Sequence, residues 1–188
     1  MAQLTIWTEI TSPVGPLRLT GDGSALTGVY LSPHRYGPNE FPHDARGSDP
    51  VLAEAARQLS AYFDGTLQEF VLPLAPAGTP FQRRVWAALC EIPYGATISY
   101  LTLARRVANE KAVRAVGGAN GRNPISIIIP CHRVIAAGGG LGGYGGGLPA
   151  KRLLLDLERS VRSGRVSPPP VSALTGEPTA ESANAAHG

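Results

Sequence analysis

The sequence has little cysteine, few aromatic residues and no long apolar segment. Its 188 residues include two cysteines, Cys90 and Cys131, and 6% aromatic residues. Two thiols cannot build the disulfide framework of a small secreted protein or a cysteine-rich zinc site. No run of 18 apolar residues occurs, and the N-terminus lacks a basic patch followed by an apolar stretch. The sequence therefore predicts a cytoplasmic protein with free thiols, without a membrane span or a secretory signal.

Charge is distributed unevenly along the chain, although the net charge is only +3. Residues 1–72 hold four basic and eight acidic side chains, whereas residues 83–133 hold eight basic and two acidic ones. A basic middle segment beside an acidic N-terminal half predicts contact with a polyanion such as nucleic acid. An uneven but simply solvated surface is the alternative interpretation of charge alone.

The N-terminal part has the pattern of a small mixed α/β unit. Strands are expected at 4–10, 16–19 and 24–31. A loop at 32–50 and an amphipathic helix at 51–63 should follow them. Gly65 ends the helix, and no residue of this part stands out as reactive. We expect a structural role for it.

A proline-rich, uncharged linker at 73–78 separates this unit from a segment of different character. Thr79 and Gln82 form a capping-box pattern, with a proline at the first helical position, which predicts a helix to about Glu91. Cys90 falls on the apolar side of that helix, so we expect it to be a core thiol.

Two short helices, expected at 100–107 and 111–119, are joined by only three residues, 108–110. This is the spacing of a helix-turn-helix. The second helix carries Arg114 and otherwise mainly small side chains, which favours close approach to a DNA minor groove over reading of the major groove. An ordinary, closely packed helical hairpin is the alternative.

The C-terminal third combines a short apolar run, a glycine-rich loop and one more helix. Residues 125–129 are expected to form a buried strand, and eight of the ten residues at 138–147 are glycine. The final helix, 148–162, places Glu158 on its apolar face, where a carboxylate needs a partner. The tail at 164–188 is expected to be disordered.

Cys131 and His132 are adjacent in the sequence and follow Pro130. A thiol is a useful nucleophile only as thiolate, and an imidazole can take its proton directly or through a water molecule. A carboxylate can orient that imidazole, and Glu158 is the best candidate. For the pair taken alone, a buried structural thiol is the favoured interpretation.

A longer set of motifs is more specific. It comprises Arg114-Ala115-Val116-Gly117, then Asn123-Pro124, then Ile129-Pro130-Cys131-His132-Arg133-Val134, and then Gly143-Tyr144. This set resembles the O6-alkylguanine-DNA alkyltransferase family, closely over residues 79–160 and more loosely over 1–72. The resemblance implies an α/β ribonuclease-H-like domain at 1–72 and, after the 73–78 linker, a mostly α, winged helix-turn-helix-like domain at 79–163 that carries the active site.

The resemblance also implies an activity and a role for individual residues. The activity is a single, irreversible transfer of an alkyl group from O6-alkylguanine, and from O4-alkylthymine, to the protein's own cysteine. Cys131 would be the acceptor, His132 its base through a water molecule, Glu158 the residue that orients His132, and Asn123 a hinge. The expected substrate-binding residues are Tyr100, Val134, Tyr144, Gly145 and Lys151. The expected DNA-binding residues are Arg114, which would fill the gap left by a flipped nucleotide, and Ala112, Val113 and Gly117.

Two departures from the family pattern bear on the pocket. Ser126 stands where some members carry proline, and the loop around Gly142 is unusually rich in glycine, so the pocket width and the largest alkyl group accepted stay open. Some eukaryotic members of the family bind zinc through N-terminal cysteine and histidine residues, but residues 1–72 contain no cysteine, so no zinc is expected. The implied alkyl transfer needs no metal or organic cofactor.

The expected partner is double-stranded DNA that contains alkylated bases, bound by a monomer, with cooperativity on DNA left open. Two other functions compete: a Cys-His-Glu hydrolase that turns over repeatedly, and a lesion-sensing helix-turn-helix protein without enzymatic activity.

Overall fold

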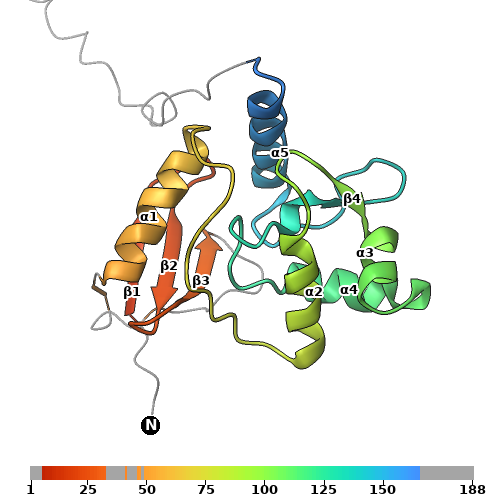
Figure 1. Ribbon diagram of the computed structural model, residues 1–188, viewed down its shortest axis with the longest axis horizontal. Coiled ribbons are helices and arrows are strands. Elements are labelled where there is room, and N and C mark those ends of the chain that lie inside the picture. Colours follow the sequence, from red (N-terminus) through yellow and green to blue (C-terminus); the bar gives the residue numbers. More distant parts are fainter. Residues whose placement is uncertain (1–5, 33–40, 42–45, 48, 166–188) are drawn as a thin grey trace, which may run out of the picture.

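The computed structural model describes residues 6–32, 41, 46–47 and 49–165, and these form two connected parts (Figure 1). In the N-terminal part, strands β1 (Ile6–Ile10), β2 (Leu17–Gly21) and β3 (Leu26–Leu31) make an antiparallel sheet in the order β1-β2-β3. Helix α1 (Pro50–Phe63) covers one face of this sheet. The predicted mixed α/β unit is confirmed, with the strand ends shifted by up to two residues.

Helix α1 begins where the sequence supplies a cap. The Asp49 side chain accepts a hydrogen bond from the backbone amide of Leu52 at 2.8 Å, and Pro50 occupies the first turn. The buried face then repeats at helical spacing and ends in Tyr62 and Phe63. The end of α1 is therefore directed into the protein interior.

The C-terminal part is mostly helical. It contains α2 (Pro80–Cys90), α3 (Tyr100–Val107), α4 (Val113–Gly121) and α5 (Leu148–Arg162). A short parallel pair, β4 (Ile98–Ser99) and β5 (Val134–Ile135), and two 3-10 turns, Glu110–Ala112 and Cys131–Arg133, complete it. The Trp86 indole N–H of α2 donates to the Ala119 carbonyl of α4 at 2.9 Å, which ties these two helices together.

The two parts share one hydrophobic core and exchange backbone hydrogen bonds. Val29 of β3 donates its amide to the Pro124 carbonyl at 2.8 Å, and the Ser126 amide donates to the Val29 carbonyl at 3.1 Å. The edge of the N-terminal sheet therefore supports the segment that leads to Cys131.

The structure corrects the expected strand at 125–129. These residues are buried, as expected, but only Ile125 bridges to Val29 and no strand forms. Ile127 has φ 75°, in the left-handed region that a β-branched residue rarely adopts. The chain therefore turns here, between Pro124 and Pro130, and cannot run on along the sheet.

Other sequence expectations differ from the structure in smaller ways. The second helix of the helical pair begins two residues later than predicted, at Val113, because residues 110–112 form a 3-10 turn first. The pair β4–β5 was not predicted, since each strand has only two residues.

The expectation that Cys90 is a core thiol is wrong. Cys90 is exposed, because the buried face of α2 ends at Leu89 and Cys90 is the last helical residue.

Some expectations concern residues outside the described part. These are the first two residues of the first strand, most of the 32–50 loop, and the tail from residue 166 onward. Within the described part, no helix has the length and apolar character needed to cross a membrane.

The capping box of α2 gives a direct stability prediction. The Thr79 hydroxyl accepts from the Gln82 amide at 3.2 Å, and the Gln82 side chain accepts from the Thr79 amide at 2.8 Å. Thr79→Ala should lower the free energy of unfolding by about 1 kcal/mol in urea titrations. Thr97→Ala is the control, because Thr97 is exposed and its side chain makes no hydrogen bond in the described chain. Equal losses in both variants would contradict the role of the cap.

Candidate active site

Cys131 lies at the start of a 3-10 turn, between the buried 125–130 segment and β5. Its residue surface is 3% exposed, so the thiol is held inside the protein. The Cys131 amide donates to the Ile129 carbonyl at 2.8 Å, and the Asn120 side chain donates to the Cys131 carbonyl at 3.4 Å. The backbone on both sides of the sulfur is thus fixed by hydrogen bonds.

Asn123 holds the turn that precedes the cysteine. Its amide nitrogen donates to the Ile129 carbonyl at 2.8 Å and to the Ile125 carbonyl at 3.4 Å, while its oxygen accepts from the Ile125 amide at 3.0 Å. Because Asn123 is 1% exposed, these bonds do not compete with bulk water. They maintain the tight path that Ile127 takes with its positive φ.

Glu158 of α5 is fully buried and accepts hydrogen bonds from four residues. Tyr62 Oη donates to Oε1 at 2.8 Å, and His132 Nε2 lies 2.8 Å from the same oxygen. Arg133 Nη2 donates to Oε1 and Arg133 Nε to Oε2, each at 2.9 Å, and the Gly95 amide donates to Oε2 at 2.9 Å. The sequence prediction that Glu158 faces inward and needs a partner is confirmed.

The donors around Glu158 determine the protonation state of the imidazole. Burial alone would raise the pKa of Glu158, but the hydrogen bonds and charges of His132 and Arg133 lower it to about 2. An ionised carboxylate can only accept, so His132 must carry its proton on Nε2. Its other nitrogen, Nδ1, is buried and has no hydrogen-bond partner among the described residues. Nδ1 is therefore the nitrogen that can accept a proton.

The thiol and the imidazole are both uncharged at neutral pH. Burial raises the pKa of Cys131 to about 11, although Asn123 and the charge of Lys151 act in the lowering direction. Burial also lowers the pKa of His132 below 6.5, against the raising effect of Glu158. A protonated thiol beside a neutral imidazole needs a proton transfer before sulfur can attack an electrophile.

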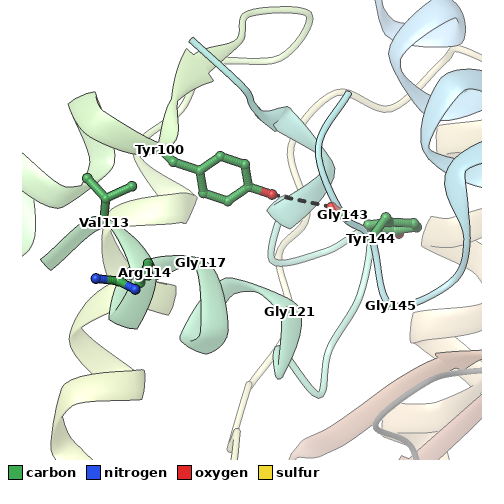
Figure 2. A pocket seen from close by; sticks show the side chains of 8 residues that line it. All are labelled: Tyr100, Val113, Arg114, Gly117, Gly121, Gly143, Tyr144 and Gly145. Atoms are coloured by element: carbon green, nitrogen blue, oxygen red, sulfur yellow. Dashed lines mark hydrogen bonds between the residues drawn. The ribbon is translucent and has the colours of Figure 1, made fainter. Parts of the chain in front are cut away.

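A cleft of about 370 Å³ opens between α3, α4 and the glycine-rich loop. The residues lining it are Tyr100, Val113, Arg114, Gly117, Gly121, Gly143, Tyr144 and Gly145. Figure 2 shows the Tyr100 hydroxyl pointing toward the loop, where it donates to the Gly143 carbonyl at 3.3 Å. Gly142, at φ 66°, is required in this loop, because a Cβ there would lie 2.9 Å from the Tyr100 ring.

Tyr100, Tyr144 and Lys151 lie between the cleft and the buried thiol of Cys131 and interact with it electrostatically. Burial and the neighbouring Cys131 raise the pKa of both Tyr100 and Tyr144, so both hydroxyls stay protonated at neutral pH. Lys151 is fully buried and donates to the Val134 carbonyl at 2.6 Å and the Gly143 carbonyl at 3.2 Å. Burial lowers the pKa of Lys151 to about 8, while Cys131 acts in the opposite direction. The thiol thus has hydroxyl and ammonium groups as electrostatic neighbours.

The structure brings most of the expected site residues together in two layers. Tyr100, Val113, Arg114, Gly117, Tyr144 and Gly145 line the cleft. The inner layer contains Cys131, His132, Glu158, Asn123, Val134 and Lys151, all of them buried. Ala112 does not line the cleft, since it lies in the 3-10 turn before α4.

Four residues of the site were not assigned a role from the sequence. Arg133 was quoted only as part of a motif, yet it is the charged partner that a buried Glu158 requires. Tyr62 lies within the expected amphipathic helix 51–63, where it had no assigned role, although a buried phenol needs a hydrogen-bond acceptor. Gly95 acts through its backbone amide and Asn120 through a contact across the fold, so their sequence positions gave no signal.

Comparison with known proteins gives consistent matches along the chain. Residues 5–76 match the family described as 6-O-methylguanine DNA methyltransferase, ribonuclease-like domain, and residues 80–160 match its DNA binding domain. The methylated-DNA--protein-cysteine methyltransferase of Mycobacterium leprae is 52% identical over 154 residues, which cover 80% of this chain and 90% of that protein. The protein of the same name from Methanosarcina barkeri is 50% identical over 152 residues, covering 80% and 95%.

Solved structures agree with these matches. The crystal structure of Mycobacterium tuberculosis OGT in complex with DNA is similar with a TM-score of 0.75 and 48% identity. The similarity covers 82% of this chain and 93% of that one. The arrangement of both parts is therefore shared with a protein crystallised on DNA.

The hydrogen bonds around Glu158 predict the tautomer of His132. In nitrogen NMR spectra at neutral pH, Nε2 of His132 should be protonated and Nδ1 unprotonated. The ring should gain its second proton only at a lower pH than an exposed histidine, because burial lowers the pKa of His132. The His132→Gln variant identifies the signals. A His132 ring that titrates at or above the pH of an exposed histidine, or a proton on Nδ1 at neutral pH, would contradict this prediction.

Proposed function

The chain belongs to the 6-O-methylguanine DNA methyltransferase family, and from this we propose that it repairs DNA by moving an alkyl group from O6 of guanine to the sulfur of Cys131. The observation that supports this most directly is the buried Cys131–His132–Glu158 arrangement beside a cleft lined by Arg114 and Tyr100. The repair is direct: the base is restored in place, and the protein is consumed.

The reaction begins with transfer of the Cys131 proton. Nδ1 of His132 accepts this proton through a water molecule, and Glu158 stabilises the imidazolium that results. The sulfur then attacks the alkyl carbon, a carbon–sulfur bond forms, and the carbon–O6 bond breaks. The electron pair of that bond stays on the guanine, which takes up a proton as it leaves. Because a thioether is not readily reversed, each molecule acts once.

Access to the alkyl carbon requires a flipped nucleotide, because the carbon lies inside the duplex. We place α3 and α4 against the minor groove, where the small residue Gly117 lets the backbone come close. Arg114, which is exposed at the edge of the cleft, fills the gap in the base stack. Val113 and Ala112 extend the same surface toward the DNA backbone.

The inner wall of the cleft would receive the base. Tyr100 donates a hydrogen bond to the flipped guanine and helps to neutralise the leaving base. Tyr144 and Gly145 line the pocket, and Val134 lies behind them in the buried layer, where its carbonyl accepts from Lys151. Lys151, which lies beneath the cleft, holds the glycine-rich loop by donating to the Gly143 carbonyl. Its positive charge also stabilises the thiolate of Cys131.

Membership of the 6-O-methylguanine DNA methyltransferase family also supports a more detailed proposal for the domain architecture. We assign residues 1–72 to a ribonuclease-H-like domain, 73–78 to a linker and 79–163 to a winged helix-turn-helix-like domain, with a tail at 164–188. Helices α3 and α4, joined through the 3-10 turn Glu110–Ala112, support the helix-turn-helix part of this description. The protein would act as a monomer on alkylated double-stranded DNA, in the cytoplasm, where Cys90 and Cys131 stay reduced.

Intact-mass measurement tests the proposed transfer. After incubation with a duplex that contains O6-methylguanine, the protein should carry a single methyl group located on Cys131. Cys131→Ala should lose all transfer but still bind the duplex, whereas Cys90→Ala should transfer normally and serves as the control thiol variant. Repeated turnover without modification of the protein would instead indicate a hydrolase.

A second test addresses Arg114. Arg114→Ala should slow transfer from duplex DNA by about tenfold or more, since the flipped state loses a stabilising wedge of a few kcal/mol. Reaction with free O6-benzylguanine should be nearly unchanged, because the free base needs no flipping. Arg152→Ala removes the same charge from α5, away from the cleft lining, and should leave both rates nearly unchanged. Equal losses of Arg114→Ala on both substrates would contradict the wedge role.

A further inference from the structure

Tyr62 reaches the reaction centre from the N-terminal part of the chain. It lies near the end of α1, is fully buried, and donates its hydroxyl to Glu158 Oε1 at 2.8 Å, although 96 residues separate the two in the sequence. The same oxygen lies 2.8 Å from His132 Nε2. We propose that Tyr62 is a positioning residue for alkyl transfer, which sets the orientation and the basicity of His132 through Glu158.

The Tyr62 ring is held in one orientation by an aromatic cluster. Phe63 and Tyr94 pack edge-on against it, with ring centres 5.3 Å and 5.9 Å away, and Phe70 packs at a tilt at 5.4 Å. The guanidinium of Arg133 lies over the Tyr94 ring at 5.5 Å. These contacts hold the Tyr62 hydroxyl next to Glu158. The side chain therefore loses little conformational entropy when the hydrogen bond to Glu158 is used in the reaction.

The Tyr62 hydroxyl stays protonated, and so remains a hydrogen-bond donor, throughout the neutral pH range. Burial, and then the charge of Glu158, raise the pKa of Tyr62 well above 10.0. Tyr62 therefore withdraws part of the negative charge of Glu158 from His132 without ever carrying a charge itself. A weaker carboxylate leaves His132 less basic, which keeps the imidazole neutral and able to accept the thiol proton.

Other groups near Glu158 and His132 also shift the pKa of His132, some upward and some downward. Arg133 beside Glu158 and Lys151 on α5 lower the pKa of His132, whereas Glu158 raises it. Cys131, Tyr94 and Tyr144 are the remaining titratable neighbours; the two phenols stay protonated and uncharged, and neither is among the groups that shift the pKa of His132. The Gly95 amide adds a fixed dipole at Glu158. Among the residues that donate to Glu158, Tyr62 is the one supplied by the N-terminal part. That part thereby contributes to the proton transfer itself.

The experiment compares Tyr62→Phe with wild type, and it rests on the proposed alkyl transfer. Single-turnover transfer from an O6-methylguanine duplex is measured at saturating protein between about pH 5.5 and about pH 9, where a histidine titrates. Without the hydroxyl, Glu158 interacts more strongly with His132, and the pKa of His132 rises. The acid limb of the rate profile should move to higher pH, with a loss of about three- to tenfold near pH 6 and less than about twofold near pH 8.5.

Tyr94→Phe is the matched control, because it removes a hydroxyl from the neighbouring ring that has no hydrogen-bond partner among the described residues. Its profile should overlay that of wild type. Each variant is normalised to its own rate near pH 8.5, and thermal melting at each pH confirms that it is folded. A purely structural role would lower the Tyr62→Phe rate equally at all pH values, and that result, like an unchanged profile, would overturn the proposal.

A second measurement separates this proposal from the function. The nitrogen NMR titration of His132 in the free protein should show a higher pKa in Tyr62→Phe than in wild type, with no substrate present. If wild type transfers no methyl group, the proposed function fails while this titration still reports on Tyr62. If wild type transfers methyl but the His132 titration is the same in both proteins, the role of Tyr62 is refuted alone.

Discussion

Burial of the Glu158 carboxylate is the constraint on which the rest of the site depends. A carboxylate without water must be surrounded by donors, because an unpaired buried charge costs several kcal/mol. Here the donors come from α1, from the turn after α2, and from the two residues that follow Cys131. Because the Glu158 carboxylate needs all of these donors, segments that are far apart in the sequence pack together around it. The imidazole of His132 is oriented by the same set of hydrogen bonds.

Burial of Cys131 likewise favours the protonated form of its thiol. A cysteine whose pKa is near 11 is almost entirely protonated at neutral pH, so it is protected from oxidation and from stray electrophiles. A protein that is used once gains from such protection, since any side reaction would consume it. In the proposed reaction the buried charge cluster would supply the base, and the hydroxyl of Tyr100 and the ammonium of Lys151 are electrostatic neighbours of Cys131.

The sequence predicted local structure well and long-range contacts poorly, and the reason is physical. Capping residues and helical stripes act within a few positions, so α1, α2, α3 and α5 could be located to within one or two residues. The inward orientation of Glu158 followed from helical spacing as well. Its contacts with Tyr62 and Arg133 did not, because they depend on how separate elements pack. The turn at Ile127 was also missed, since a run of isoleucines ordinarily favours a strand.

That turn shows why the two parts of the chain cannot be treated as independent. Holding Ile127 at a positive φ is unfavourable, so other contacts must compensate for it. One set comes from Asn123, which bonds both ends of the turn, and another comes from Val29 on the edge of the N-terminal sheet. The path that places the thiol thus depends on a strand from the N-terminal part of the chain, just as the carboxylate behind His132 depends on a helix from that part. In this protein the contacts that join the domains also define the geometry of the reaction centre.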